Sequence, residues 1–327
     1  MGRVILTGLV LFLCVITCCG AETNGGASLI SDSALVATVN GEPVICREFM
    51  LLARSQRSRV INEYLHNHGG EYGSDFWSRN YNGKTPMDVL KKRTLDTIVS
   101  IKIQEICARQ AGLVDDISYR GFLKALEAEN HRRLVAKQTG KVIYGPVQYS
   151  EEVYYNYLFS NLVNNLKENL AGSVFSITDE KLKATYERQK DSLYRKGFIT
   201  EVRLVKLEHG MEKAGDDKGK AMQKAETVLV FNDSVYVPEE EDPFRLIVRE
   251  TAGKMAVGQS SQPIEFQGTF YIVHVKNRIS LGFRNFESCK TAVRMVLLDR
   301  MYDQYIRGLV NQAACLPDKD VYEQIHY

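Results

Sequence analysis

Residues Met255–Arg278 read MAVGQSSQPIEFQGTFYIVHVKNR, and this stretch decides the fold of the region around it. The turn-forming segment VGQSSQP precedes a short extended run, IEF, and the turn QGT then leads into the apolar run FYIVHV. Turn residues between runs rich in β-branched and aromatic residues are the local signature of a hairpin. We therefore predict a β-hairpin that closes a small unit of mixed structure.

The unit that this hairpin closes begins near Thr200. EVRLVKLE (201–208) predicts a strand, GKAMQKAETVLVF (219–231) predicts a helix, and PFRLIVRETAG (243–253) predicts a second helix. The acidic run Glu239–Asp242 is typical of a solvated loop. Together these segments predict an α+β unit.

Helical patterns flank this unit on both sides. VATVNGEPV predicts a hairpin around Asn40-Gly41, and farther along Thr85 caps a helix that Pro86 opens and Gly112 ends. We expect that helix to bury an apolar face formed by Leu95, Ile98, Val99, Ile103, Ile106 and Cys107. Further helices are predicted over 118–138, 150–170, 177–194 and 285–314, and we expect the last of them to pack on the first ones.

The size and charge of the chain exclude some functional classes. It has 327 residues, of which 44% are hydrophobic, so it is long enough for two domains with a packed core. Its 42 basic and 40 acidic residues leave a net charge of only +2. Because no bulk field attracts the chain to nucleic acid, we expect no nucleic-acid partner.

The first residues predict export. Arg3 precedes the apolar run VILTGLVLFLCVIT, which is short for a membrane span and ends in small residues. We predict a signal peptide over 1–21, a polar spacer over 22–33 and an extracytoplasmic location. Cys18 and Cys19 are lipidation candidates in a poor lipobox, and the alternatives are cleavage after Ala21 without lipid and an uncleaved anchor.

Residue types that bind metals or form covalent intermediates are scattered outside this leader. Four cysteines are so widely spaced that disulfides are allowed but not indicated: Cys46, Cys107, Cys289 and Cys315. The pair His66 and His68 has no further ligands at a recognisable spacing, and the sequence contains no phosphate loop, GxSxG or HExxH motif. We expect no metal, no cofactor and no nucleotide.

Three segments carry a resemblance to a known family: VATVNGEPVICREFMLL (36–52), DFWSRNYNGKTPMDVLKK (75–92) and residues 144–191. They resemble the N-terminal helical domain of the SurA and PrsA class of extracytoplasmic foldases, while the hairpin of 255–278 resembles the end of a parvulin-type prolyl isomerase domain. The resemblance implies a mainly helical α+β fold. It implies a helical chaperone domain over 34–195, a parvulin-like domain over 196–280, and a C-terminal helical segment over 281–327 that packs on the helical domain.

The same resemblance implies where catalysis would take place. Active parvulins share a first-strand histidine, a central cysteine or aspartate, a last-strand histidine and a Met/Phe proline pocket. In this chain the first-strand position falls near Arg203, the last-strand position falls at Phe270 or Tyr271, and Asp233 or Asp242 is nearest to the central acid. A guanidinium accepts no hydrogen bond, and neither aromatic ring replaces a neutral imidazole. We therefore predict a degenerate parvulin-like domain.

A few other residues are candidates for binding. His274 shares a strand face with Phe270, where a histidine of the sheet surface is commoner than a displaced catalyst. Client-binding candidates are Phe76, Trp77, Tyr81 and Met255, because aromatic side chains bury much area at low entropic cost. A lone tryptophan is nevertheless more often the anchor of its loop.

These observations predict an ATP-independent folding factor that captures unfolded or newly exported polypeptides in an apolar cradle between helices. The enzymatic alternative is an active prolyl isomerase with a pocket built from Tyr271 and Met255. A further alternative is a structural surface lipoprotein.

Overall fold

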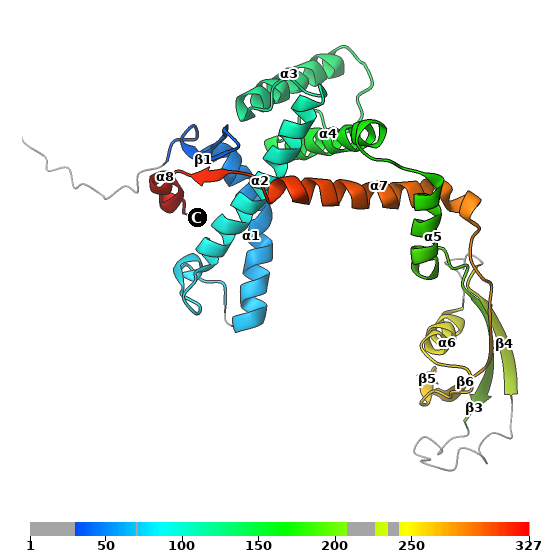
Figure 1. Cartoon of the computed structure of the whole chain (residues 1–327). Coiled ribbons are helices and arrows are strands. Elements are labelled where there is room, and N and C mark those ends of the chain that lie inside the picture. Colours follow the sequence, from blue (N-terminus) through cyan, green and yellow to red (C-terminus); the bar gives the residue numbers. More distant parts are fainter. Residues whose placement is uncertain (1–29, 70, 208–225, 235–241, 327) are drawn as a thin grey trace, which may run out of the picture. The chain divides into compact units, whose positions relative to one another are not determined.

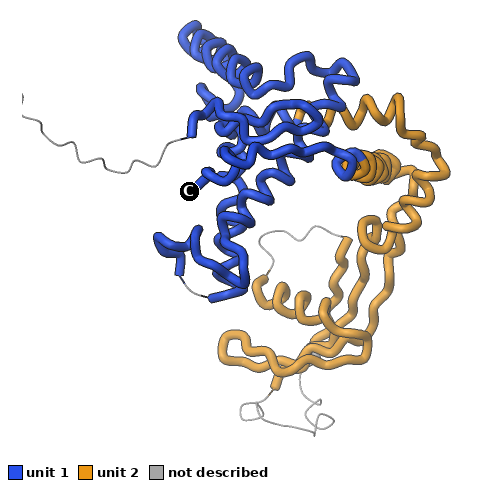
Figure 2. Tube along the Cα trace, turned by 60° about the vertical axis from the view of Figure 1, so that its left-hand side comes forward, with its two compact units in different colours: residues 1–160, 309–327 blue, residues 161–308 orange. Residues whose placement is uncertain are grey.

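The computed structural model describes residues 30–69, 71–207, 226–234 and 242–326. The chain divides into two compact units, one formed by residues 1–160 with 309–327 and the other by residues 161–308 (Figure 2). The unit limits fall within helix α4 (Glu151–Ser173) and within helix α7 (Phe286–Val310). The predicted domains 34–195, 196–280 and 281–327 stay a prediction. The predicted leader and its cysteines, Cys18 and Cys19, lie outside the described residues.

The first and last strands of the described chain meet in one small sheet of the first unit (Figure 1). Strands β1 (Leu35–Val39) and β2 (Glu42–Ile45) pair antiparallel through the predicted turn, where Asn40 and Gly41 have φ values of 49° and 86°. Only residues that tolerate positive φ fit this turn. Strand β7 (Cys315–Pro317) pairs with the other edge of β1, so the order is β2-β1-β7. The short helix α8 (Lys319–Gln324) follows and packs on β1.

Helices complete the first unit. They are α1 (Cys46–His68), the 3-10 turn η1 (Phe76–Ser78), α2 (Pro86–Gln110), α3 (Tyr119–Gln138) and the first part of α4. The predicted limits of α2 are confirmed: Thr85 and Asp88 form a capping box, Pro86 opens the helix, and Gly112 follows its end with a φ of 69°. A cluster of α1, η1 and α2 buries Val60, Phe76, Met87 and Leu90 among others.

The buried face of α2 also carries a charge. Ile98, Ile103 and Cys107 are buried as predicted, but Lys102 is buried beside them, at 1% exposure. Its Nζ donates to Glu48 Oε1 of α1 at 2.8 Å and to Glu105 Oε2 at 3.0 Å. An ion cluster therefore lies inside the helical core.

The second unit joins a helical layer to a four-stranded sheet. Helix α5 (Asp179–Leu193) packs on α7 through a cluster that includes Leu182, Tyr186, Val293 and Leu297. The antiparallel sheet contains β3 (Phe198–Lys206), β4 (Glu226–Asn232), β5 (Ile264–Phe266) and β6 (Thr269–Ser280) in the order β4-β3-β6-β5. Helix α6 (Pro243–Gly253) packs on β6. The mainly helical α+β fold is thus confirmed, with a small antiparallel sheet between helical segments.

One predicted helix is wrong. The segment 219–231 ends in strand β4 rather than in a helix, and β4 pairs with β3 from Glu226 to Asn232. The physical reason is the period of two in its side chains: Val228 and Val230 are 52% and 55% exposed, whereas Phe231 is 2% exposed. The β-branched residues and the pairing with β3 favour the strand over a helix at 226–231. Residues 219–225 of the predicted helix lie outside the described residues.

The predicted hairpin of 255–278 is confirmed. Strands β5 and β6 pair antiparallel, with Phe266 opposite Thr269, and Gln267 and Gly268 occupy the turn with φ values of 50° and 74°. Among the residues that the structure describes, no helix combines the length and apolar composition that crossing a membrane requires.

Candidate functional site

The two candidate residues of the last strand lie on opposite faces of the sheet. Tyr271 faces α6, where its ring centroid lies 4.5 Å from that of Phe244, and it packs against the core that includes Val273 and Val275. Phe270 alternates to the other face and is paired in register with Glu265. The two side chains therefore cannot serve the same site, and Tyr271 is the one that joins the apolar cluster beneath α6.

The first-strand candidate, Arg203, lies next to a histidine. It pairs in register with His274 of β6, on the face opposite the buried Val202 and Leu204. His274 Nδ1 and Ser260 Oγ are hydrogen-bonded at 3.0 Å. A guanidinium donates hydrogen bonds and cannot accept one. A fixed positive charge therefore stands at the first-strand position, where the parvulin resemblance implies a histidine.

A half-buried apolar cluster lies between α6 and the hairpin. The rings of Phe244 and Phe266 are 5.0 Å apart, and Met255 and Tyr271 pack against the same core. Arg278 fixes the end of α6, because its guanidinium donates to the carbonyl oxygens of Met255 at 2.9 Å and Ala252 at 2.6 Å. The cluster is apolar and contains no nucleophile.

The two candidates for a central acid have structural contacts. Asp233 Oδ2 accepts a hydrogen bond from the backbone N–H of Phe198 at 3.0 Å. Asp242 caps α6, since its Oδ1 accepts from the backbone N–H of Phe244 at 3.0 Å. Each carboxylate thus has a local role at a strand end or a helix start.

The aromatic candidates of the Gly-rich loop pack onto the helical core. Phe76 is fully buried and Trp77 is 8% exposed, and their rings meet edge to face at 5.1 Å. Tyr81 is half-buried and packs against Tyr64 and His68, with ring centroids 5.1 and 4.7 Å away. Client binding by these residues stays a prediction.

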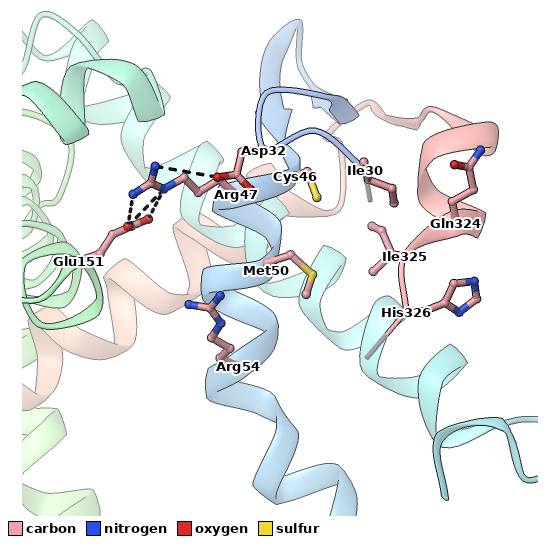
Figure 3. Close-up of a pocket in the computed structure, with 10 residues that line it drawn as sticks. All are labelled: Ile30, Asp32, Cys46, Arg47, Met50, Arg54, Glu151, Gln324, Ile325 and His326. Carbon is pink, nitrogen blue, oxygen red and sulfur yellow. Dashed lines mark hydrogen bonds and ion pairs between the residues drawn. The ribbon is translucent and has the colours of Figure 1, made fainter. Parts of the chain in front are cut away.

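A cavity of about 570 Å³ in the first unit was not predicted (Figure 3). Its lining comes from the start of the described chain, from one face of α1, from the first residue of α4, and from the C-terminal segment: Ile30, Asp32, Cys46, Arg47, Met50, Arg54, Glu151, Gln324, Ile325 and His326. Figure 3 shows Arg47 joined to Glu151 across the cavity wall; its Nη2 and Oε2 are 2.7 Å apart. This hydrogen bond lowers the pKa of Glu151. No sequence signal connects these segments, because the C-terminal residues reach them through tertiary contacts: β7 pairs with β1, and Tyr322 of α8 packs its ring on Phe49 of α1.

The four cysteines of the described chain are free thiols. Burial raises the pKa of Cys46, Cys107 and Cys315 above the ordinary thiol value. Since the thiolate is the reactive form, these three cysteines act as small apolar side chains rather than nucleophiles.

Two curated relatives match most of the sequence. One is a chaperone for lacto-N-biosidase from Bifidobacterium longum subsp. longum, 24% identical over 229 residues, which cover 68% of this chain and 78% of that protein. The other is the foldase protein PrsA of Caldanaerobacter subterraneus subsp. tengcongensis, 22% identical over 315 residues, which cover 86% of this chain and 88% of that protein. No family model matches the sequence.

One solved structure illustrates the likeness to known folds. A chain from the study of PEB4 and the periplasmic protein Cj1289, two SurA-like chaperones of Campylobacter jejuni, is 13% identical and covers 87% of this chain and 98% of its own, with a TM-score of 0.33. The two curated relatives indicate the class of this protein, which is a foldase or chaperone. Within that class the chain is similar to the SurA/PrsA-like foldases.

Proposed function

We propose that this protein is an extracytoplasmic chaperone that binds unfolded or newly exported polypeptides without ATP, and that its sheet domain contributes little or no prolyl isomerisation. The observation that carries the proposal is the pairing of Arg203 with His274. A permanent cation occupies the position where the parvulin resemblance implies a neutral imidazole.

The physical requirements of prolyl isomerisation support the proposal that the sheet domain has little or no catalytic activity. Rotation about a peptide bond faces a barrier of about 18–20 kcal/mol, and an isomerase must bind the twisted amide better than the planar one. Such selective binding needs an apolar slot and a few placed polar groups. Here the apolar cluster of Phe244 and Tyr271 lies on the face opposite Arg203 and His274, so slot and polar groups are separated by the sheet.

Capture without ATP follows from weak, reversible contacts. Apolar side chains on helices bind unfolded segments through buried area, and modest affinity lets the client leave as it folds. A light-scattering assay of a chemically denatured client diluted into buffer without nucleotide tests this. We expect aggregation to fall as the full chain is added, and unchanged aggregation at excess chain would reject the chaperone proposal.

The proposed location outside the cytoplasm rests on the apolar leader. Lipid attachment at Cys18 or Cys19 belongs to this proposal as one of two processing routes. Mass spectrometry of the mature N-terminus separates them, because a lipidated cysteine adds the mass of acyl chains, whereas cleavage after Ala21 leaves an unmodified peptide.

An active prolyl isomerase is the second candidate. The half-buried cluster of Phe244, Met255 and Tyr271 favours it, because such a surface fits a proline ring. A proline-containing tetrapeptide assay distinguishes the two functions. Acceleration like that of an active parvulin, lost in Met255→Ala and kept in the opposite-face control Phe270→Ala, would establish the enzyme and overturn the degenerate site.

A structural surface lipoprotein is the remaining alternative. It predicts lipidation at Cys18 or Cys19 together with no effect on client aggregation and no isomerase activity. The three assays therefore give a different combination of results for each function.

A further inference from the structure

The connection between α3 and α4 exposes two apolar side chains almost fully to solvent. Val142 is 80% exposed and Tyr144 is 86% exposed. Around them, at the same end of the two helices, Val135, Val153 and Tyr157 are 42%, 50% and 51% exposed. Single exposed apolar residues are ordinary on proteins, but several at one place indicate a binding surface.

The backbone that carries these side chains is held firmly by Arg133, which is itself 7% exposed. Its Nη1 donates to the carbonyl oxygens of Tyr144 at 2.9 Å and Pro146 at 2.8 Å, and its Nη2 donates to the hydroxyl of Tyr149 at 2.8 Å. The guanidinium also lies over the Tyr149 ring, 4.4 Å from the centroid. A buried charge with this many partners fixes the geometry of the connection.

Asn130 adds a second attachment. Its side chain donates to the carbonyl oxygen of Tyr149 at 3.0 Å and accepts from the Tyr149 N–H at 2.7 Å. The Tyr149 ring in turn stacks on Tyr157, with centroids 6.1 Å apart and planes inclined by 12°. Since the connection is already ordered, a ligand that covers Val142 and Tyr144 loses less entropy than it would on a loose loop.

Basic residues predominate in the connection, although Glu129 lies directly before it and Glu151 and Glu152 directly after it. Residues 130–150 contain Arg132, Arg133, Lys137 and Lys141 but no aspartate or glutamate. Glu129 pairs with both arginines, at 2.7 and 2.9 Å. Lys137 and Lys141 are exposed, and in the described part of the chain no ion pair holds either of them. A positive field therefore borders the apolar side chains.

We propose that Lys137, Lys141, Val142, Tyr144 and Tyr157 form a preorganised docking surface for acidic, apolar segments of unfolded polypeptide. We name these five residues the α3–α4 tip. The proposal rests on the proposed chaperone function and adds a charge preference to it. An anionic membrane surface has the same two properties, but the chaperone class of the relatives favours a polypeptide as the occupant.

Fluorescence anisotropy with two labelled peptides tests the charge preference. One peptide alternates Leu and Phe with Glu, and the matched peptide has Lys in place of every Glu. We expect the full chain to bind the acidic peptide about tenfold more tightly, with the difference falling at high salt. The double variant Lys137→Glu/Lys141→Glu should reverse the preference.

A second variant tests the apolar contacts. Val142→Ser/Tyr144→Ser should weaken binding of the acidic peptide by about tenfold, because both side chains would be covered in the complex. Both are exposed, so the unfolding midpoint should not change. Tyr149→Phe leaves the surface unaltered and removes one acceptor of Arg133, and we expect a smaller loss of affinity from the looser connection.

Matched controls lie far from the tip in sequence. Leu316 is 67% exposed and Lys183 is exposed, so Leu316→Ser and Lys183→Glu should leave peptide binding unchanged. Equal affinity for the two peptides, or an unaltered preference in Lys137→Glu/Lys141→Glu, would overturn the proposal. Binding to anionic phosphatidylserine vesicles that requires the tip, with no peptide binding, would also overturn it and assign a membrane surface instead.

The light-scattering assay keeps this proposal separate from the proposed function. If aggregation is suppressed while the tip variants bind peptide like the wild-type chain, only the docking surface is rejected. If aggregation is not suppressed although the acidic peptide binds at the tip, the chaperone function is rejected and the surface stands.

Discussion

The cores of the two units are built on different chemistry. In the first unit the packing of α1 on α2 encloses Lys102, Glu48 and Glu105. In the second unit the apolar core between the sheet and α6 is formed by Val202, Leu204, Phe231, Val248, Ala252, Val273 and Val275. Among its described residues the second unit buries the polar Thr185 and Thr200 but no charged side chain. Apolar burial is insensitive to protons, whereas a buried ion cluster depends on the protonation of its members.

The ion cluster holds one positive and two negative groups. Glu48 and Lys102 are each 1% exposed, and the Glu105 side chain is 13% exposed. Burial raises the pKa of Glu105 to about 7 and also raises the pKa of Glu48, although Lys102 opposes both shifts. Glu48 and Glu105 share one cation, Lys102. The stability of the first unit should therefore depend on pH near neutrality, while the stability of the sheet core should not.

The largest effect should come from removing the lysine. Lys102→Met leaves Glu48 and Glu105 buried without a cation, which should cost about 3–5 kcal/mol of unfolding free energy at pH 8. The loss should be smaller at pH 5, where the carboxyl groups take up protons. Urea unfolding followed by the fluorescence of Trp77, the chain's only tryptophan, reports this unit selectively.

The triple variant Lys102→Met/Glu48→Leu/Glu105→Met is the matched control. It replaces the whole cluster by apolar side chains, which should recover most of the lost stability, as buried ion pairs exchanged for apolar residues commonly do. An unfolding midpoint of Lys102→Met equal to that of the wild-type chain would show that the cluster does not support the first unit.

A cavity in the sheet core should lower the unfolding free energy by a smaller amount, and this loss should not depend on pH. Leu204 is 6% exposed, and Leu204→Ala should cost about 3 kcal/mol through lost burial and the cavity left behind. Hydrogen exchange of the β3 and β6 amides measures the loss, and the Trp77 signal should not change. A loss that differs between pH 5 and pH 8 would contradict the distinction between the two cores.

The elements that the sequence predicts depend on local chemistry. The Asn40-Gly41 turn, the Thr85 capping box and the hairpin at Gly268 are each determined by a few neighbouring residues with restricted backbone preferences. Such features can be predicted from a single sequence. The prediction of a helix over 219–231 is wrong because the strand at its end forms by pairing with β3. Helix and strand propensities of single residues do not include such pairing.

The features that the sequence missed depend on distant partners. Strand β7 has three residues, too few for a pattern, and exists because Cys315–Pro317 pairs with β1. From the sequence, Lys102 is expected on the solvent-exposed face of α2. It is buried because Glu48 of α1 pairs with it. Of the candidate site, the positions of Arg203 and Tyr271 on strands were predicted, but their separation onto two faces required the register of β3 and β6.

The stability of the first unit should depend on pH, and this dependence tests the difference between the two cores. A carboxyl group whose folded pKa of about 7 lies above its unfolded value stabilises the fold at low pH, and this contribution is lost as pH rises through about 7. Stability of the first unit should therefore fall by about 1–3 kcal/mol between pH 5 and pH 8. Glu105→Gln, which stays neutral, should remove most of this slope.

The groups that face the cluster come from every neighbouring element. Glu48 lies on α1, Tyr119 on α3, Tyr155 on α4 and Glu42 on β2, and the pKa of Tyr155 is raised well above its ordinary value by burial and then by Glu105. The tyrosines stay neutral between pH 5 and pH 8. Glu63→Gln at a partly exposed pair with Arg93 is the control and should keep the slope. An unchanged slope in Glu105→Gln would place the pH response elsewhere.

The smallest effect on stability should come from breaking an exposed ion pair. This variant tests whether an ion pair stabilises the protein only when it is buried. Arg294 of α7 and Glu168 of α4 are 2.8 Å apart, but their side chains are 40% and 62% exposed. Arg294→Met should cost less than about 1 kcal/mol, because water and salt screen the pair. The difference should vanish at high salt, whereas that of Lys102→Met should persist, since salt does not reach the buried cluster. A salt-resistant loss in Arg294→Met comparable to that of Lys102→Met would mean that ion pairs stabilise this protein regardless of burial.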